Sequence, residues 1–368
     1  MKIAHLLYES EGDAFGIGGA GVRAYEIYRR LRDRHDITLV CKRYPGARDR
    51  EVDGLRHVHV GVESPSLTRT LLAYAGQARA FVGRRGSAFD VLVEEFSPAI
   101  PTFLHAVSPR PVVLQIQGYT GRHYFRKYNP AYAAVLFGLE RLRPRFYRHV
   151  IMLSRHTAAR VSLRKDARVA IVPNGIRREL LDRVPSEGNY VLYLGRLDAY
   201  SKGLDTLLRA YPTFLASCPD VRLVIAGDGK DRATFDAMVE RLPARVRASV
   251  DTPGWVSGER KLELLSRARF VVVPSRHEVQ PLGALEAMAC AKALLVSDIP
   301  ELRDVADRGG GLAFRTGDAE GLAQAMTTLT GRGDLAQMGR CGRSSVQDDT
   351  WDTIALRFEA ALLGAVER

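Results

Sequence analysis

The stretch VVVPSRHEVQPLGALEAMAC, residues 271–290, joins a short apolar run to an apolar helix pattern through a polar loop. Phe270–Val273 is typical of a buried strand in a parallel sheet. Pro281 lacks an N–H group and favours the first turn of a helix, so a helix is expected to begin there. This places Glu278 on the loop and Glu286 in the second helical turn. A carboxylate among apolar residues is costly to bury alone, so Glu286 requires a partner.

The same alternation of strand and helix patterns runs along the whole chain, which predicts parallel α/β architecture. It pauses after PNGI (173–176), in a polar stretch through Gly188, and then restarts. With 368 residues, two domains are expected, at 1–175 and 176–350, followed by a closing helix over 351–368. The expected strands are Ile3–Tyr8, Ile37–Cys41, Val91–Val93, Val112–Ile116, His149–Leu153, Val169–Val172, Tyr190–Leu194, Val221–Ala226, Val250–Thr252, Phe270–Val273 and Ala293–Val296.

Composition indicates an ordinary globular protein that works in a reducing compartment. The four cysteines lie far apart and form no CxxC pair, which argues against a structural zinc site or a disulfide framework. The N-terminus lacks the pattern of a signal peptide, and no apolar run approaches the roughly 20 residues of a membrane span. We therefore expect a cytoplasmic protein whose contact with a membrane, if any, is peripheral at its inner face.

Positive charge is concentrated in one segment. The net charge is +12, and between Arg122 and Arg168 twelve Lys and Arg face only Glu140 and Asp166, which gives that segment +10. Aromatic residues are interleaved with these cations, a mixture suited to an anionic membrane, a phosphorylated acceptor or nucleic acid. The alternative is a set of ordinary solvated helix faces.

A glycine cluster, Gly16–Gly21, lies between the first strand and the first helix and fits GxGxxG, the fingerprint of dinucleotide-binding proteins. Seven residues separate it from the strand, however, and the second strand ends in Val40-Cys41-Lys42 with no acidic residue for a ribose. This favours a loop whose glycines let a substrate or a partner domain approach. An NAD-dependent oxidoreductase remains an alternative.

Two cations, Arg196 and Lys202, follow the expected strand Tyr190–Leu194 in YLGRLDAYSKGLD (193–205). They would lie at the carboxyl edge of the sheet, the rim where open α/β sheets bind ligands. An Arg fork and a Lys point charge at this edge could clamp a diphosphate. An ordinary surface Arg and Lys are the alternative.

The expected helix start at Pro281 provides a second anion site, because the free N–H groups of Leu282 and Gly283 would point outward with the positive end of the helix dipole. Glu278 would lie at the mouth of this site, and Glu286 could accept two hydrogen bonds from a ribose diol. Pairing of Glu286 with an Arg of the core is the alternative. The sequence has no Asp-x-Asp motif and no cluster with metal-ligand spacing, so no metal is expected.

These motifs together resemble retaining nucleotide-sugar glycosyltransferases of family 4. The resemblance rests on Glu-x7-Glu in HEVQPLGALEAMAC, preceded by VVVPS, with GRLDAYSKG, VPNGI, VIAGDG, PGWV and SDIPELRDV in the same half and GIGGAGVRAYEIYRRL in the N-terminal half. It implies the GT-B fold: an N-terminal acceptor-binding and a C-terminal donor-binding Rossmann-like domain that face each other across a cleft, with the last helix crossing back to the first domain.

The resemblance also implies a role for each candidate residue. Arg196 and Lys202 would bind the diphosphate and stabilise it as a leaving group, with Glu278 on the sugar hydroxyls as the third catalytic residue. The remaining donor-binding residues would be Glu286 on the ribose, Leu282 and Gly283 at phosphate or sugar oxygens, Gly18 and Gly19 near the phosphates, and Val256 beside the base, next to Trp255. Many members of the family carry a His where this chain has Gln117, so Gln117 is expected either to replace it by hydrogen bonding or to change substrate preference.

The expected activity is thus metal-independent, cofactor-free transfer of a sugar from a UDP-, GDP- or ADP-sugar to an acceptor hydroxyl, as in synthesis of the cell envelope or of glycoconjugates. The acceptor, whether a sugar, a lipid-linked molecule or a small molecule, is not fixed by the sequence. Segment 122–168 is expected to contact an anionic membrane, and nucleic acid is not an expected partner. The competing hypothesis is a basic membrane-surface or nucleic-acid-binding protein with a degenerate donor site.

Overall fold

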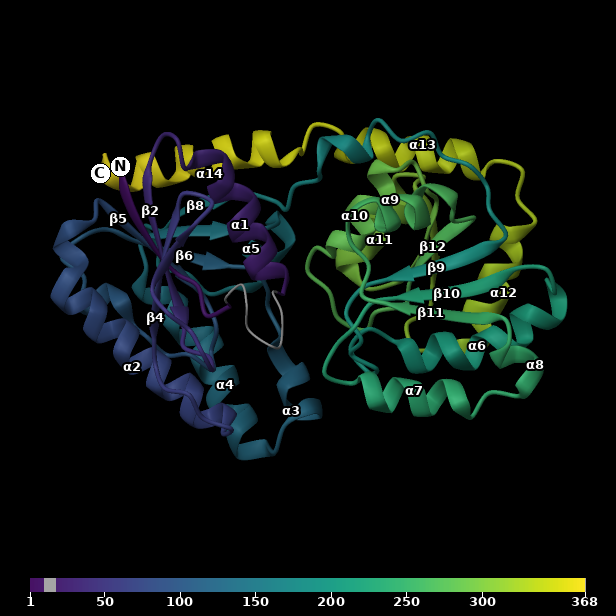
Figure 1. Cartoon of the computed structure of the whole chain (residues 1–368), viewed down its shortest axis with the longest axis horizontal. Coiled ribbons are helices and arrows are strands. Elements are labelled where there is room, and N and C mark those ends of the chain that lie inside the picture. Colours follow the sequence, from purple (N-terminus) through teal and green to yellow (C-terminus); the bar gives the residue numbers. More distant parts are fainter. Residues whose placement is uncertain (10–17, 368) are drawn as a thin grey trace. The chain divides into compact units, whose positions relative to one another are not determined.

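The computed structural model of the chain describes residues 1–9 and 18–367. The chain divides into two compact units (Figure 1). Unit 1 contains Met1–Gly175 together with the segment from Trp351 onward, and unit 2 spans Ile176–Thr350. Each unit is built on one largely parallel sheet, which confirms the predicted α/β class with two Rossmann-like sheets.

Unit 1 has an eight-stranded sheet in the order β3-β4-β2-β1-β5-β6-β7-β8, parallel except where β3 pairs with β4. The strands are β1 (Lys2–Leu6), β2 (Asp36–Lys42), β3 (Arg50–Val52), β4 (Leu55–Val60), β5 (Val91–Glu95), β6 (Val112–Ile116), β7 (His149–Met152) and β8 (Arg168–Ile171). The α-helices are α1 (Gly19–Leu31), α2 (Leu67–Arg85), α3 (Tyr124–Lys127), α4 (Pro130–Leu142), α5 (Arg155–Arg160) and α14 (Trp351–Val366).

Unit 2 has a six-stranded parallel sheet in the order β11-β10-β9-β12-β13-β14. Its strands are β9 (Tyr190–Leu194), β10 (Arg222–Ala226), β11 (Val250–Gly254), β12 (Phe270–Val273), β13 (Leu294–Ser297) and β14 (Gly311–Phe314). Its helices are α6 (Leu204–Ser217), α7 (Arg232–Glu240), α8 (Ala244–Arg247), α9 (Gly258–Arg267), α10 (Leu282–Ala289), α11 (Pro300–Asp307), α12 (Ala319–Thr330) and α13 (Leu335–Val346).

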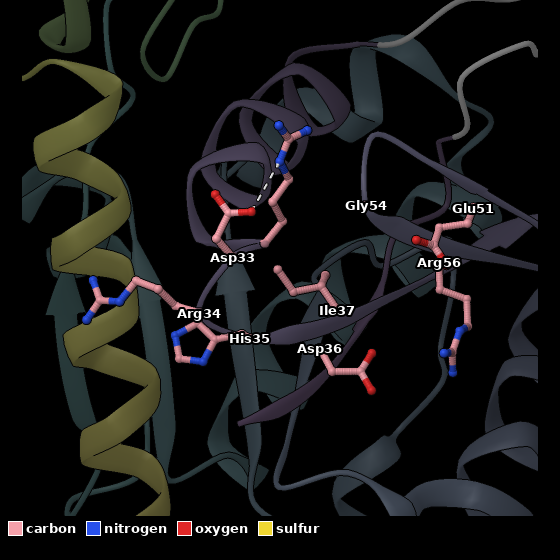
Figure 2. Close-up of a pocket in the computed structure, with 9 residues that line it drawn as sticks. Asp33, Arg34, His35, Asp36, Ile37, Glu51, Gly54 and Arg56 are labelled. Atoms are coloured by element: carbon pink, nitrogen blue, oxygen red, sulfur yellow. Dashed lines mark ion pairs between the residues drawn. The ribbon is translucent and has the colours of Figure 1, made fainter.

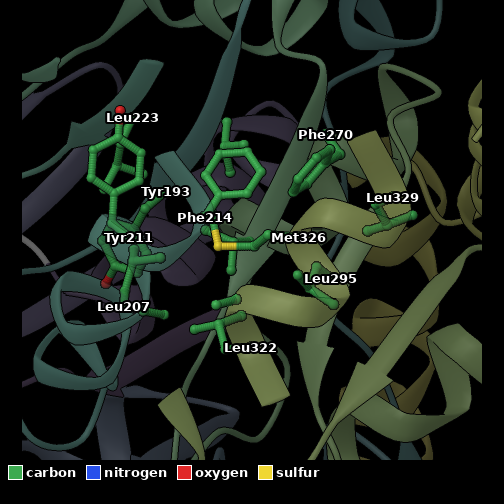
Figure 3. Packing of buried hydrophobic residues seen from close by; sticks show 14 of the residues in the cluster. Tyr193, Leu207, Tyr211, Phe214, Leu223, Phe270, Leu295, Leu322, Met326 and Leu329 are labelled. Atoms are coloured by element: carbon green, nitrogen blue, oxygen red, sulfur yellow. The ribbon is translucent and has the colours of Figure 1, made fainter. Parts of the chain in front are cut away.

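Alternating strand side chains build one core on each face of the unit 2 sheet. Val191 and Tyr193 of β9 join the cluster with α6 and α12, which Figure 3 shows around Phe214 and Met326. Leu192, between them, joins the cluster with α9 and α10 on the other face. Strands buried on both faces are typical of parallel sheets, which explains why their sequences are continuously apolar.

The C-terminal helix α14 belongs to unit 1 and packs against α1. Trp351 sits against Gly175 so closely that a Cβ on this glycine would lie 2.7 Å from the indole ring. Further along, the Arg30 guanidinium contacts Asp352 at 2.8 Å, and the ring of Tyr28 meets that of Phe358 edge-on with centroids 5.7 Å apart. The apolar spacing of the tail therefore does form a helix, as predicted.

The β3–β4 hairpin was not among the expected strands. Asp53 and Gly54 both have positive φ, of 54° and 74°, as a tight hairpin turn requires. In β4, His57 and His59 are buried at 0% and 3% exposure, and the His57 ring stacks on that of Tyr25. These imidazoles occupy positions that an aliphatic residue would normally fill, which hid the alternation of the strand.

Burial makes unit 1 sensitive to acid. Desolvation, reinforced by the charge of His59 and of Arg50, lowers the pKa of His57 from 6.5 to about 4. The unfolded chain accepts a proton on His57 more readily than the folded protein does. The free energy of unfolding is therefore highest above pH 6.5 and falls by up to about 1.4 kcal/mol per pH unit as the pH drops toward 4.

We predict that the thermal midpoint falls between pH 7 and 5 less steeply in His57→Phe than in the wild type. An equal slope in both proteins contradicts this, and His123→Phe, at an exposed position, serves as the control.

Candidate active site

The candidate site of unit 2 lies at the carboxyl edge of its sheet, where open parallel sheets bind ligands. Two glycines allow the main chain to pack against the end of β9. A Cβ on Gly227 would lie 1.8 Å from the carbonyl oxygen of Gly195, and one on Gly283 would lie 2.5 Å from that of Leu194. The loop after β10 and the start of α10 therefore lie against the β9 terminus.

The loop after β9, residues 195–203, is fastened to the loop after β12. The Arg276 guanidinium donates to the carbonyl oxygen of Tyr200 at 2.7 Å, and it also forms a two-pronged ion pair with Asp205, in the first turn of α6, at 2.6 and 2.7 Å. Gly203 has φ of +67°, and a Cβ there would lie 1.9 Å from the carbonyl oxygen of Pro274, so only glycine fits. This contact places Lys202 directly beside the segment that carries Glu278.

Lys202 and Glu278 form an ion pair with 2.5 Å between Nζ and Oε1. The same carboxylate oxygen accepts a hydrogen bond of 2.8 Å from the Ser275 hydroxyl, which is fully buried. Glu278 is only 8% exposed, so the lysine and the hydroxyl supply the partners that its burial demands. Two of the predicted catalytic residues are thus in direct contact.

Arg196 is exposed, and within the described part of the chain its guanidinium makes no hydrogen bond or ion pair. Its carbonyl oxygen accepts a 2.9 Å hydrogen bond from the Tyr193 hydroxyl. Burial, reinforced by the Glu278 charge, raises the pKa of that hydroxyl, which keeps it a donor. The structure therefore fixes the Arg196 main chain and leaves the side chain available, whereas the Lys202 charge is already paired.

The start of α10 lacks a capping side chain. The helix begins at Leu282 after Pro281, and its first turn contains no acidic residue. Among the described residues, no acceptor reaches the N–H groups of Leu282 and Gly283. The predicted pair of free donors is therefore present beside the end of β9, with the positive end of the helix dipole.

Glu286 is paired with a lysine and not with a core arginine. Its Oε1 lies 2.6 Å from Nζ of Lys261 on α9, and the two side chains are 15% and 23% exposed. The neighbouring Cys290 thiol is buried, and desolvation with the Glu286 charge raises its pKa to about 12, so the thiol is inert. Sequence reasoning missed Lys261, because no spacing rule pairs residues on successive helices of an α/β unit.

The segment after β11 carries Trp255 and Val256 next to Gly254, which has φ of +76°. Val256 is 9% exposed and joins the core below, whereas the Trp255 indole is 66% exposed. Both lie just beyond the carboxyl end of their strand. The proximity of Val256 to a nucleotide base stays a prediction.

The glycine residues of unit 1 accommodate a carboxylate of the chain itself. Gly18 precedes α1, and a Cβ there would lie 2.4 Å from Oε1 of Glu9, while a Cβ on Gly19 would meet nothing within 4 Å. The other oxygen of Glu9 accepts a 2.6 Å hydrogen bond from the Gly21 N–H. This carboxylate stands where a dinucleotide-binding helix receives a pyrophosphate, which disfavours the NAD alternative. Gly16 lies outside the described residues.

Gln117 follows β6 at the carboxyl edge of the unit 1 sheet. Its amide nitrogen lies 3.1 Å from each carboxylate oxygen of Glu95, the last residue of β5. Gln117 is partly exposed, and its role toward a sugar stays a prediction.

The basic segment 122–168 forms α3, α4 and α5, but not all of its charge is at the surface. The Arg143 guanidinium is fully buried against Glu94, and Glu140 is buried where it accepts hydrogen bonds from the N–H groups of Thr120 and Gly121. Arg143 therefore belongs neither to a solvated helix face nor to a membrane-contact surface. Large apolar side chains are nevertheless exposed between the other cations: Phe125, Tyr128, Tyr132, Val135, Leu142 and Phe146.

A separate pocket in unit 1 lies at the amino end of β2 and is lined mainly by charged side chains, including Asp36, Glu51 and Arg56 (Figure 2). None of the predicted site residues lines it. Across residues 1–9 and 18–367, no group of three or more His, Cys, Asp and Glu side chains is arranged to hold a metal ion. Over the same ranges, no helix combines the length and apolar character needed to cross a membrane.

Comparison with known families identifies the chain. Residues 17–180 match Glycosyltransferase Family 4, and residues 188–331 match Glycosyl transferases group 1. These two matches cover most of both units. The chain therefore belongs to the family 4/group 1 glycosyltransferases, and the resemblance inferred from the sequence motifs is confirmed.

Relatives and solved structures agree with this assignment. A phosphatidyl-myo-inositol mannosyltransferase of Mycolicibacterium smegmatis is 31% identical over 189 residues, 49% of this chain and 47% of the relative. The chain spans about half the length of the curated relatives it matches. Sucrose-phosphate synthase from Thermosynechococcus elongatus superposes with a TM-score of 0.81 at 20% identity, over 98% of this chain and 97% of the other. Anabaena HepE in complex with UDP-glucose gives 0.74 at 17% identity, over 99% and 100%. These structures confirm the GT-B fold.

Removing Lys202 should expose the cost of burying Glu278. We predict that Lys202→Met destabilises unit 2 by about 1–3 kcal/mol, because it leaves a mostly buried carboxylate without its cation. Adding Glu278→Gln to this variant should restore part of the loss, since the residual amide carries no charge. The calorimetric unfolding midpoints of the two single variants, the double variant and wild type measure the coupling.

The matched control is Arg303→Met, which removes the surface partner of Asp307 at 3.9 Å and should shift the midpoint little. Additive effects of Lys202→Met and Glu278→Gln would show that the 2.5 Å contact does not stabilise the protein.

Proposed function

We propose that the protein is a retaining glycosyltransferase that moves a sugar from a nucleoside-diphosphate sugar to an acceptor hydroxyl. The observation that carries the proposal is the convergence, at the carboxyl edge of unit 2, of Arg196, the Lys202–Glu278 pair and the free N–H groups at the start of α10. The UDP-glucose bound to Anabaena HepE, which has a similar fold, supports a nucleotide-sugar donor.

In the proposed reaction, the bond between the anomeric carbon and the diphosphate oxygen breaks, and negative charge develops on the departing diphosphate. Arg196, Lys202 and the N–H groups of Leu282 and Gly283 stabilise that charge, since preorganised cations and donors act most strongly where charge develops. As Lys202 turns toward the diphosphate, the Glu278 carboxylate becomes available to accept hydrogen bonds from sugar hydroxyls. The acceptor hydroxyl attacks on the face that the diphosphate leaves, the diphosphate takes its proton, and the anomeric configuration is retained.

Glu286 is assigned to the ribose. Its second carboxylate oxygen and the partial exposure of its pair with Lys261 leave Glu286 able to accept hydrogen bonds from a diol. Val256 would flank the base, and Gly18 and Gly19 would approach the phosphates if Glu9 moves away. Because protein cations and a helix start meet the diphosphate charge, we propose that the reaction needs neither metal nor cofactor.

A nucleotide panel tests the donor site. UDP, GDP, ADP and NAD are added separately to the protein in EDTA and in Mg²⁺, and thermal unfolding is recorded. One nucleoside diphosphate should stabilise the wild type without metal, by about 2.7 kcal/mol at a hundred times its dissociation constant. Glu286→Ala should abolish this gain, whereas Glu320→Ala, at an exposed position on α12, should keep it.

The nucleotide sugar of the stabilising base is then offered with an acceptor panel, and the anomeric configuration of the product is read by NMR. Stabilisation by NAD alone, or by no nucleotide, would overturn the donor assignment. An inverted product would overturn retention alone.

We further propose that unit 1 binds the acceptor and that segment 122–168 contacts an anionic membrane on the cytoplasmic side, as in synthesis of lipid-linked or cell-envelope glycans. Exposed aromatic side chains such as Phe125 and Tyr128, at 45% and 40% exposure, alternate with the exposed cations Arg122 and Arg126 on and before α3. This mixture suits the headgroup region of a bilayer. The phosphatidyl-myo-inositol in the name of the mannosyltransferase relative supports a lipid acceptor.

Vesicle co-sedimentation at low salt tests the membrane contact. The protein should bind vesicles of phosphatidylcholine with phosphatidylglycerol and not vesicles of phosphatidylcholine alone. Reversing Arg122 and Arg126 to Glu should weaken binding by about tenfold or more, since each basic residue near the surface contributes about 1 kcal/mol. Reversing Arg241 and Arg245 of unit 2, which are also exposed, is the control. Equal binding to both vesicle types would contradict the contact.

A further inference from the structure

Two consecutive glutamates at the end of β5 point to opposite faces of the unit 1 sheet and have different surroundings. Glu94 is 1% exposed and is enclosed by the buried guanidinium of Arg143, the Thr102 hydroxyl and the Tyr147 hydroxyl, the last at 2.7 Å. Glu94 therefore forms a buried, structural ion pair with Arg143. Glu95, in contrast, has a side chain that is 12% exposed and lies at the carboxyl edge.

Side chains from β1 and from β6 and the residue after it, on either side of β5, lie around the Glu95 carboxylate. His5 Nε2 of β1 lies 3.2 Å from its Oε1. Gln115 stands opposite Glu95 in the β5–β6 register and donates its amide to the same oxygen. Gln117, two residues further along the chain and just after the end of β6, donates hydrogen bonds from its amide nitrogen to both oxygens at 3.1 Å. The carboxylate therefore holds the amides of Gln115 and Gln117 by hydrogen bonds at one place on the edge, with the His5 ring beside it.

This arrangement determines which way the amide of Gln117 faces. An ionised carboxylate only accepts hydrogen bonds, so the NH₂ group of Gln117 must face Glu95 and its carbonyl oxygen Oε1 must face away. Within the described ranges, Oε1 of Gln117 receives no hydrogen bond, and the residue is partly exposed. Gln115, by comparison, is 1% exposed and cannot present its amide to a ligand. One oriented acceptor is thus available at the edge where parallel sheets bind ligands.

We propose that Glu95 is a positioning residue that holds Gln117 as an obligatory hydrogen-bond acceptor for a hydroxyl group of a neutral sugar substrate. The inference rests on the proposed glycosyltransferase function and adds a specificity rule to it. A substrate that offers a hydroxyl hydrogen at this point is bound, while a group that only accepts, such as fluorine or a carboxylate, meets the Gln117 oxygen and the Glu95 charge. If the Glu95–Gln117 contact only joined the ends of β5 and β6, the Gln117 oxygen would bind no substrate and no such specificity would arise.

The test measures kcat/KM for sugars in which single hydroxyls are replaced by fluorine, which is similar in size but cannot donate. One arm uses monodeoxyfluoro forms of UDP-glucose and GDP-mannose, and the other uses monodeoxyfluoro methyl glucosides and mannosides as acceptors. The two arms distinguish a donor-sugar hydroxyl from an acceptor hydroxyl. In the wild type, one position should show a loss of about tenfold, the scale of one lost hydrogen bond with an unpaired acceptor left behind.

The variants identify the group responsible. Gln117→Ala should lower kcat/KM for the parent sugar and remove the penalty for that fluorinated position. Glu95→Gln should also reduce the penalty, because an amide at residue 95 lets the Gln117 side chain turn and offer its NH₂ group. Glu51→Gln, which removes an exposed carboxylate of β3, should leave both values unchanged. Thermal unfolding of each variant confirms that it is folded.

A fluorine penalty that is equal in wild type, Glu95→Gln and Gln117→Ala, or absent at every position, would overturn the inference while leaving the transferase function intact. Failure of the wild type to transfer any sugar in either arm would instead overturn the proposed function, and the inference with it.

Discussion

The close approach of the main chain to the end of β9 is the constraint on which the unit 2 site depends. Gly227, Gly283 and Gly203 each stand where a Cβ would come within 2.5 Å of a carbonyl oxygen. Their small size brings the loop after β10, the start of α10 and the Lys202 loop to one edge. The packing of the main chain around the end of β9 therefore brings cations, a carboxylate and free N–H groups to one edge of the sheet.

Paired charges follow from this crowding. Glu278 and Glu286 lie on or beside an apolar helix, and each has a lysine within 2.6 Å, Lys202 in one case and Lys261 in the other. The site is thus nearly compensated before a ligand arrives, which avoids the cost of isolated buried charges. In the proposed reaction, the diphosphate would have to compete with Glu278 for Lys202, and this competition would free the Glu278 carboxylate for the sugar.

Much of the fold could be predicted because buried parallel strands are continuously apolar. Tyr190–Leu194, Val112–Ile116 and Phe270–Val273 have the predicted bounds in the structure. The β3–β4 hairpin was missed although Asp53-Gly54 is a recognised turn signal, because His57 and His59 look polar in sequence and are buried.

The side chains of the site were predictable where a motif carried them, but their partners were not. The pairing of Glu278 with Lys202, of Glu286 with Lys261 and of Gln117 with Glu95 joins residues that are 76, 25 and 22 positions apart. Only the three-dimensional arrangement of strand ends brings such residues together. The sequence could therefore show that Glu286 needs a partner but not which residue supplies it.

Hydrogen–deuterium exchange with a saturating nucleoside diphosphate, in EDTA, tests the central claim most directly. The account predicts slower exchange in residues 195–203, 254–262 and 275–289, where Arg196, Lys261 and the start of α10 lie, because bound phosphate and ribose would occupy or order these groups. No protection in these three segments, or protection confined to the start of α1 in unit 1, would contradict a donor site at the carboxyl edge of unit 2.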